Sequence, residues 1–246
     1  MESILYDSKN SATYRFGLHL LDFVPRDRSQ SVIDIGSGSG ALTRELMFYA
    51  GDVIGVDKDI RTVARASQKY PTVTFYVMDA LRLQYENRFD IAFSNATFHE
   101  VEDKAKLLSS ILKCLRPGGK LVAEFPASDC STEYFEELDR VLATHGVEDG
   151  RAYHFIDKRA CHALLEQSGF EIERLVHYRR NIKLRCDRDI VREDVLSTIN
   201  RQVPSDVREA IADEMMEYVD KTFAIKNGYN RGIARLQIVA SKPITE

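Results

Sequence analysis

The sequence has no tryptophan, only four cysteines and six prolines, and no apolar run long enough to cross a bilayer. A membrane-spanning helix needs roughly 18 or more consecutive apolar residues, so we expect no contact with a membrane. Cys114, Cys130, Cys161 and Cys186 lie far apart and form no C-x-x-C pair. This spacing argues against a structural zinc site and against a disulfide scaffold. We therefore expect no metal, reduced thiols and a cytoplasmic protein.

An excess of charge of either sign is also missing. The 34 basic and 38 acidic side chains leave a formal net charge of −4, so no overall positive field attracts nucleic acid. A hydrophobic content of 44% is ordinary for a globular protein. No repeat, linker or low-complexity tract divides the chain, and we expect one domain over residues 1–246. Nothing in the pattern indicates an oligomeric state.

Apolar β-branched runs alternate with segments of helical periodicity through the first half of the chain. This alternation is typical of βαβ units and a parallel sheet covered on both faces. We expect strands at 31–35, 52–56, 73–77, 89–94 and 120–125, and helices at 12–24, 40–49, 59–69 and 103–115.

The last third of the chain follows a different pattern. Helical periodicity occurs at 132–144, 157–168, 188–200 and 205–223, and extended segments occur at 170–184 and 232–242. Two long extended segments around a helical insertion predict an antiparallel pair at one edge of the sheet. We expect a helical cap inserted at 185–228, before the last strand, and an N-terminal helical lid at about 1–30.

The stretch "SVIDIGSGSGAL" at 31–42 joins the first strand to the next helix through three glycines. Gly36 and Gly38 with Ala41 fit the dinucleotide pattern G-x-G-x-x-[G/A], whereas Gly36, Gly38 and Gly40 fit the turn usual for S-adenosylmethionine (SAM). Asp57, at the end of the second strand, can accept hydrogen bonds from the ribose of either ligand. The turn alone therefore leaves NAD and SAM as alternatives.

Three further features favour SAM. Asp34 precedes the glycines, where a carboxylate suits a cationic amino group better than an anionic pyrophosphate. Asp79, in "VMDA" after the third strand, is placed for an exocyclic adenine amine. The segments "FDIAFSNATFHEV" and "LRPGGKLVAEF" then follow in a pattern that NAD enzymes do not share.

The segments "VIDIGSGSG", "VIGVDKD", "VMDA", "FDIAFSNATFHEV" and "LRPGGKLVAEF", in this order, resemble those of class I SAM-dependent methyltransferases. The resemblance covers nearly the whole chain. It implies a Rossmann-like, seven-stranded, mostly parallel α/β sheet with an antiparallel edge, and SAM as cofactor. The glycines would contact the methionine portion, Asp57 the ribose, and Asp79 with Ala80 the adenine. The implied cofactor residues are Asp34, Gly36, Gly38, Gly40, Asp57, Lys58, Asp79, Ala80 and Asn95.

The acceptor is harder to predict, because methyl transfer from a sulfonium mainly requires alignment and dehydration of the acceptor. His99, just past the fourth strand, is the catalytic candidate, since it could orient or deprotonate an acceptor. One arginine of the cluster at 179–188 could bind a carboxylate bidentately, and Arg231 and Arg235 are candidates of the same kind. The predicted substrate-binding residues are Tyr6, Tyr14, His99 and Arg180.

More closely, the chain is similar to trans-aconitate methyltransferase-like enzymes in "LYDSKNSATYRFGLHLLDFV", "FSNATFHEV" and "NGYNRGIARLQIVASKP". That resemblance implies methylation of a small molecule at a carboxylate oxygen. Two departures weaken the implied substrate: Glu100 stands where tryptophan is common, and "PASDCSTEYF" lacks a glycine-rich stretch. Another metabolite, a carrier-bound acyl group, or a SAM-binding regulatory module without turnover are the alternatives.

Overall fold

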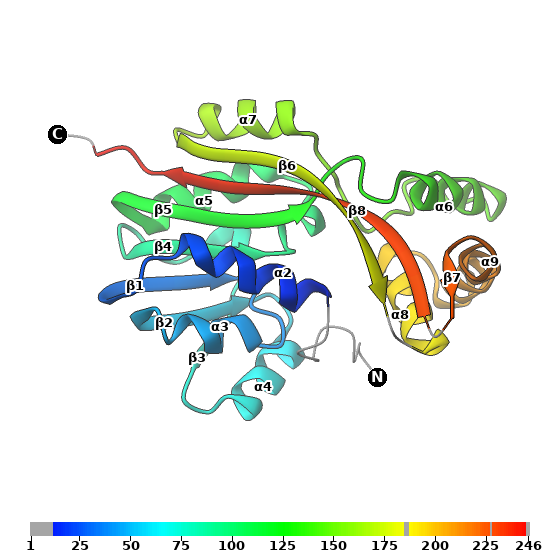
Figure 1. Cartoon of the computed structure of the whole chain (residues 1–246), viewed down its shortest axis with the longest axis horizontal. Coiled ribbons are helices and arrows are strands. Elements are labelled where there is room, and N and C mark those ends of the chain that lie inside the picture. Colours follow the sequence, from blue (N-terminus) through cyan, green and yellow to red (C-terminus); the bar gives the residue numbers. More distant parts are fainter. Residues whose placement is uncertain (1–11, 185–186, 227, 245–246) are drawn as a thin grey trace.

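A computed structural model describes residues 12–184, 187–226 and 228–244, and its centre is one eight-stranded sheet (Figure 1). The strand order is β3-β2-β1-β4-β5-β8-β6, with β7 paired to β8. The strands are β1 (Asp27–Ile35), β2 (Ala50–Asp57), β3 (Thr74–Val77), β4 (Phe89–Asn95), β5 (Leu115–Pro126), β6 (Glu171–Leu184), β7 (Ala224–Ile225) and β8 (Gly228–Ser241).

The first five strands are parallel, and β8 pairs antiparallel with both β5 and β6. This confirms the predicted mostly parallel sheet with an antiparallel edge. The predicted number of seven strands is wrong by one, because Ala224 and Ile225 pair with the start of β8. Strand order reverses at β1, between β2 and β4, and ligands of such sheets bind at the carboxyl ends of the strands beside this point.

Helices cover both faces of the sheet. They are α2 (Ala12–Leu20), α3 (Ala41–Leu46), α4 (Ile60–Lys69), α5 (Lys104–Cys114), α6 (Thr132–Thr144), α7 (Lys158–Gln167), α8 (Arg188–Thr198) and α9 (Ser205–Phe223), with short 3-10 turns η1 (Leu21–Phe23), η2 (Ala80–Arg82) and η3 (Phe98–Glu100). Asp59, Asp103 and Asp157 begin α4, α5 and α7 by accepting backbone N–H groups, as good N-caps do. Within the described residues, no helix has both the length and the apolar character to cross a membrane.

Alternating side chains of the central strands point to opposite layers. Val32, Phe93 and Val122 pack beneath α2 with Leu20, whereas residues such as Ile33 belong to the larger core under α5. The predicted N-terminal helical lid at about 1–30 is helical only in part of its described residues, and its role as a lid stays a prediction. Residues 12–23 form α2 and η1 against the sheet, residues 27–30 already belong to β1, and residues 1–11 lie outside the described part of the chain.

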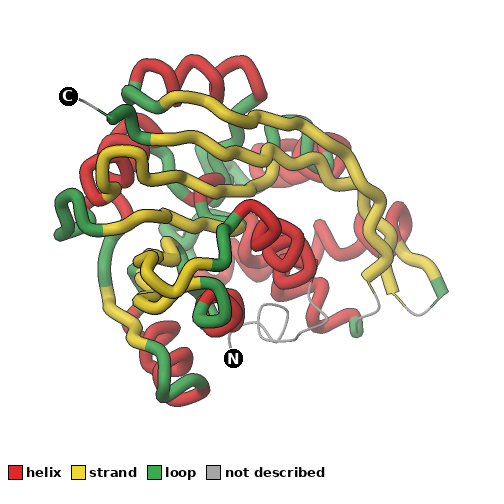
Figure 2. Tube along the Cα trace, turned by 60° about the vertical axis from the view of Figure 1, so that its left-hand side comes forward, coloured by secondary structure: helices red, strands yellow, loops and turns green. Residues whose placement is uncertain are grey.

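A second apolar core lies beyond the sheet, where β6 and β8 continue as a two-stranded ribbon (Figures 1 and 2). It joins α6, α8 and α9, which we call the cap, through buried side chains that include Leu138, Val195 and Met215. The predicted cap at 185–228 omitted α6. Helix α6 belongs to it because its apolar face packs on α9 rather than on the sheet.

Candidate functional site

The turn between β1 and α3 carries the three glycines of the sequence motif. Gly36, Gly38 and Gly40 have φ angles of 71°, 50° and 77°, a region that favours glycine. A Cβ on Gly36 would lie 2.0 Å from Thr97 Oγ1, so that position must be glycine for packing. A Cβ on Gly38 would meet no atom closer than the Gly36 oxygen at 4.0 Å. The backbone at Gly38 thus borders open space that a ligand can occupy.

Asp57 faces this turn from the end of β2. Its Oδ2 accepts the Gly38 N–H at 3.1 Å, and its Oδ1 accepts the Asp59 N–H at 3.0 Å. Each carboxylate oxygen can accept a further hydrogen bond. The backbone therefore fixes the carboxylate and leaves it acceptor capacity for a diol, and the predicted contact with a ribose stays a prediction.

Asp34 lies beneath the turn rather than at its mouth. Its side chain is buried, and Oδ2 accepts a hydrogen bond from Thr43 Oγ1 of α3 at 2.6 Å. Burial raises the pKa of Asp34 to about 7, with the nearby Asp57 charge adding to the effect. Asp34 is thus held by α3 through Thr43, and its predicted contact with a cationic amino group stays a prediction.

The remaining residues predicted for the cofactor line the same end of the sheet. Asp79 is exposed after β3, and its Oδ1 accepts the Leu81 N–H at 2.9 Å, which starts η2 at Ala80. Lys58 is exposed, with Nζ 4.0 Å from Glu100 of η3. These contacts leave the Asp79 carboxylate and the Ala80 backbone at the surface beside the end of β3.

Asn95, the last residue of β4, has structural partners on both groups of its amide. Its Nδ2 donates to the Thr13 carbonyl of α2 at 2.9 Å, and its Oδ1 accepts from Arg235 Nη2 at 3.2 Å. Arg235 in turn forms a buried ion pair with Glu124, with Nε 2.7 Å from Oε1. Asn95 therefore connects α2 to the sheet through hydrogen bonds. Its predicted contact with the cofactor would be a second role.

The Glu124 carboxylate is the centre of a buried polar network at the ends of β5 and β8. Besides Arg235 it accepts Gln237 Nε2 at 3.0 Å. Burial and a hydrogen bond to Glu124 raise the pKa of Tyr178. The sequence-based prediction missed Glu124 and Tyr178, although a carboxylate inside the apolar run "KLVAEF" was a signal for a buried partner.

Arg180 lies on the same side of β6 as Tyr178, two residues further along. Its guanidinium carbon is 4.9 Å from the Tyr178 ring centroid and 5.6 Å from that of Phe16 in α2, and Arg235 stacks on the same Phe16 ring at 4.7 Å. Among the described side chains no carboxylate pairs with Arg180. Glu124 and Arg235 balance each other's charge, whereas Arg180 is exposed and keeps a guanidinium group, unpaired among the described residues, beside Phe16.

His99 in η3 is buried among aromatic rings. Tyr153 lies edge-on at 4.5 Å between ring centroids, and Phe155 is stacked at 6.2 Å. Burial, with the charges of Arg235 and Lys104, lowers the pKa of His99 to about 3. Its Nδ1 is buried with no hydrogen-bond partner among the described residues. The lowered pKa makes His99 a weak base, which disfavours the general-base alternative, whereas an orienting role through Nδ1 is compatible with this environment. The predicted catalytic role of His99 stays a prediction.

Comparisons with known proteins agree with this geometry. Residues 33–123 match the family model described as a methyltransferase domain. The chain is similar to trans-aconitate 2-methyltransferase of Acidovorax ebreus, at 29% identity over 158 residues, which are 63% of this chain and 60% of that enzyme. It is also similar to the enzyme of the same name from Methylobacterium radiotolerans, at 26% identity over 97% of this chain and 96% of that one. Residues 33–123 thus match a methyltransferase domain, and the chain as a whole is similar to class I SAM-dependent methyltransferases.

Solved structures show the same fold. The YcgJ protein from Bacillus subtilis has a TM-score of 0.65 at 19% identity, covering 94% of this chain and 98% of that one. Phosphoethanolamine N-methyltransferase 2 of Haemonchus contortus, solved with S-adenosylhomocysteine, has a TM-score of 0.58 at 21% identity, covering 94% of this chain and 53% of that one. At identities this low, the structural matches show only that the fold is the same. The match to the first curated relatives spans only 60% of their length.

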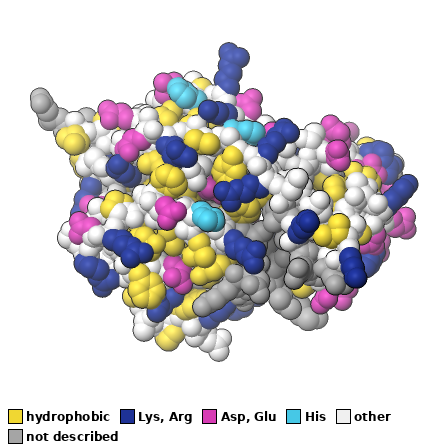
Figure 3. All heavy atoms as spheres, viewed as in Figure 1, with side chains coloured by type: hydrophobic (Ala, Val, Ile, Leu, Met, Phe, Trp, Pro, Cys, Tyr) yellow, Lys and Arg dark blue, Asp and Glu magenta, His cyan; other side chains and the backbone are white. Residues whose placement is uncertain are grey.

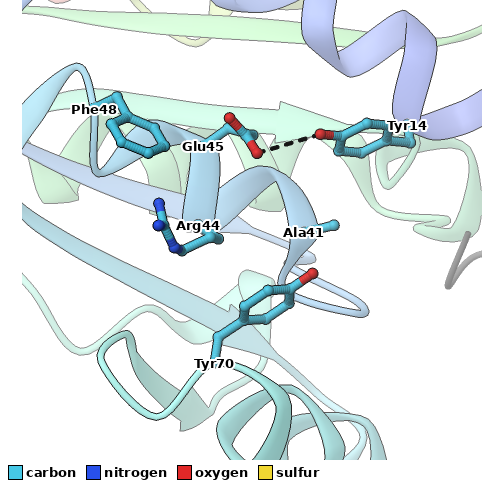
Figure 4. A pocket seen from close by; sticks show the side chains of 6 residues that line it. All are labelled: Tyr14, Ala41, Arg44, Glu45, Phe48 and Tyr70. Atoms are coloured by element: carbon cyan, nitrogen blue, oxygen red, sulfur yellow. Dashed lines mark hydrogen bonds between the residues drawn. The ribbon is translucent and has the colours of Figure 1, made fainter. Parts of the chain in front are cut away.

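The structure brings most residues predicted for the cofactor to one end of the sheet, and of the two predicted substrate tyrosines it describes only Tyr14. Tyr14 lines a cavity of about 370 Å³ on the outer side of α3, together with Ala41, Arg44, Glu45, Phe48 and Tyr70 (Figure 4). The Tyr14 hydroxyl donates to Glu45 Oε1 at 3.3 Å. Tyr6 lies outside the described residues. The substrate contact predicted for each tyrosine stays a prediction.

Basic side chains do not gather in one place on the face drawn in Figure 3. Among the described residues on this face, Lys and Arg are spread over the sheet and the cap and are interspersed with Asp and Glu. Arg180, which has no described carboxylate partner, is therefore a single exposed cation and not part of a broad basic surface on this face.

Proposed function

We propose that this protein transfers the methyl group of SAM to a small-molecule acceptor, and that the acceptor atom is a carboxylate oxygen. The observation that carries the proposal is the open backbone of Gly38 opposite the fixed carboxylate of Asp57, inside the segment that matches the methyltransferase domain. Open space above the Gly38 backbone, beside a carboxylate with spare acceptor capacity, suits a nucleoside whose chain crosses the turn.

The residues present fit SAM. Asp57 would accept its ribose hydroxyls, the turn at Gly36, Gly38 and Gly40 would hold the methionine portion, and Asp79 with Ala80 would hold the adenine. When bound, SAM supplies an electrophilic methyl group on a sulfonium. Asp34, with a pKa of about 7 under the turn, would favour its ionised form when a cationic amino group binds above it.

An anionic acceptor fits the opposite side of the site. Arg180 has no described carboxylate partner and stacks on Phe16 and Tyr178, so it can bind a carboxylate through two hydrogen bonds. A carboxylate is already ionised at pH 7 and needs no general base. The neutral His99 agrees with such chemistry, since it can hydrogen-bond an acceptor without removing a proton. The trans-aconitate relatives add support for this acceptor class.

Transfer to an amine is the second candidate. It is favoured by 36% identity to phosphoethanolamine N-methyltransferase 2 of Caenorhabditis elegans, over 124 residues that are 48% of this chain and 27% of that enzyme. A phosphate could also pair with Arg180. An ammonium acceptor must lose a proton before transfer, however, and His99 with a pKa of about 3 is poorly suited to take it. The carboxylate is therefore our first choice.

Labelled-methyl SAM, incubated with the protein and a metabolite extract, tests the proposal. We expect label in a small molecule that mild alkali releases as methanol, the behaviour of a carboxyl ester. Arg180→Met should raise KM for that acceptor with little change in the SAM Kd. Arg179→Met is the matched control, because Arg179 is bound to Asp129. Alkali-stable label would contradict the carboxylate, and bound SAM without any transfer would favour a regulatory module.

A cytoplasmic location and the absence of a nucleic-acid partner stay predictions from the sequence.

A further inference from the structure

Lys104, the first residue of α5, is a buried lysine with an unusual set of partners. Only 5% of the residue is exposed, and burial of an ammonium group is costly unless it is paired or hydrogen-bonded. No carboxylate of the described residues lies within ion-pairing distance of it. Instead, Nζ donates to two backbone carbonyls, that of Val101 at 2.8 Å and that of His154 at 2.5 Å.

The second of these carbonyls belongs to the segment 150–156, which lies in the connection between α6 and α7 (Figure 1). His154 is held through both of its backbone groups, because its N–H donates to the His99 carbonyl at 2.7 Å while its carbonyl accepts from Lys104. His154 is thus fixed between η3 and the start of α5. Its neighbours Tyr153 and Phe155 are the two rings that enclose His99.

The other end of the segment is attached to the cap. Ala152 N donates to the Thr198 carbonyl at 2.8 Å, Asn200 N donates to the Gly150 carbonyl at 2.7 Å, and the Tyr153 and Ser197 hydroxyls are 3.0 Å apart. The segment therefore joins the cap to the end of β4. On the β4 side, the hydrogen bonds of His154 with His99 and Lys104 hold it.

We propose that Lys104 is a positioning residue whose ammonium group clamps the segment 150–156 to the end of β4 and thereby sets the aromatic wall around His99. The importance of this wall for the acceptor rests on the proposed function, since it takes His99 as part of the acceptor site. A leucine or methionine would satisfy burial at this position at lower cost. The ammonium group of Lys104 instead binds two backbone carbonyls that belong to separate segments. This arrangement indicates that the side chain holds the two segments together.

Loss of the clamp should also change how His99 titrates. The groups that face His99 are the charges of Arg235 and Lys104 and the rings of Tyr153 and Phe155. Removal of the ammonium group removes one positive charge and frees the wall to admit water. Both changes favour protonation of His99, so its pKa should rise toward the ordinary range.

The test compares Lys104→Met with Lys104→Arg, which keeps the charge and donors, and with Lys106→Met, an exposed lysine in the same turn of α5. Amide hydrogen exchange and histidine NMR titration are measured for each full-length variant. For Lys104→Met we expect exchange of the His154 amide at least tenfold faster and protonation of His99 at higher pH. We expect Lys104→Arg to restore most of the protection and Lys106→Met to behave as the wild type. If Lys104→Met does not fold, Lys104→Gln replaces it with the same expectations.

Unchanged exchange at His154 and an unchanged His99 titration would overturn the proposal. Faster exchange spread evenly through α5, with His99 unaffected, would also overturn it, because Lys104 would then only stabilise its own helix. SAM titration into the wild type separates this result from the proposed function. If the wild type does not bind SAM, the proposed methyltransferase function is contradicted. The exchange data on His154 still decide whether Lys104 holds the segment 150–156.

Discussion

The buried ion pair between Glu124 and Arg235 allows a quantitative prediction. Their side chains are 1% and 6% exposed, so solvent screening is negligible. Removal of one partner from a buried pair costs about 3–5 kcal/mol, because the other charge stays buried without compensation. Arg235→Met leaves the carboxylate with a donor from Gln237, and we expect a cost of about 3 kcal/mol. Glu124→Gln leaves the guanidinium without any counter-charge, and we expect a cost of about 5 kcal/mol.

Replacement of both residues should cost less than the sum of the single changes. The double variant, Glu124→Gln with Arg235→Met, removes both charges, so neither charge stays buried without its partner. Urea unfolding followed by circular dichroism gives the free energy of unfolding for each variant, and a constant m-value shows that the states compared are the same. The exposed pair Arg88–Asp52, 40% and 49% exposed, is the control, and Arg88→Met should cost at most about 1 kcal/mol. Additive effects of the two buried changes, or single costs as small as the control, would refute this reasoning.

Three further predictions concern single residues. Asp57→Ala should weaken SAM binding by about 1.5–3 kcal/mol, the scale of charge-assisted hydrogen bonds, and an unchanged Kd in calorimetry would contradict the ribose assignment. Asp34 has a folded-state pKa of about 7, above the unfolded value, so its contribution to stability is present at low pH and falls as pH rises from about 4 to 7. Asp34→Asn should remove that slope, and identical pH profiles in denaturant unfolding would show that Asp34 is ionised throughout. The pKa of His99 is lowered to about 3, so stability is lost as pH falls from about 6.5 towards 3, and NMR should show no protonation of His99 above pH 5 in the folded wild type.

The strands and the glycine turn could be predicted because they depend on local sequence. Continuous β-branched runs such as "SVIDI" end in glycines whose φ angles only glycine adopts easily. The position of Asp57 at the end of β2 could be predicted for the same reason, because it also depends on a local apolar run. The structure therefore agrees with the sequence at the end of the sheet where SAM is proposed to bind.

Side-chain direction was predicted less well, although strand alternation contained the information. Ile33 and Ile35 belong to the core under α5, so Asp34 between them must point to the other face, where Thr43 of α3 binds it. The same alternation places Glu124 with Val122 on the face of α2. Position next to a glycine motif says nothing about whether a neighbouring helix covers the side chain.

Contacts between distant segments could not be predicted from one sequence. The packing of α6 on α9, the ion pair of Glu124 with Arg235, and the contact of Lys104 with His154 join residues that no local pattern relates. The neutral state of His99 depends on such contacts as well. The acceptor side of the site, built from these long-range contacts, is therefore the part that required the structure.

The central claim, that the turn at Gly38 holds SAM, is tested most directly by titrating SAM into three forms of the protein. Gly38→Ala and Gly146→Ala both introduce a Cβ at positive φ, 50° and 68°, with open space around it, so both carry similar backbone strain. Only Gly38 borders the proposed cofactor. The account predicts that wild type and Gly146→Ala bind SAM with similar Kd values, whereas Gly38→Ala binds at least tenfold more weakly. Equal SAM affinity in all three forms, or no binding by the wild type, would contradict it.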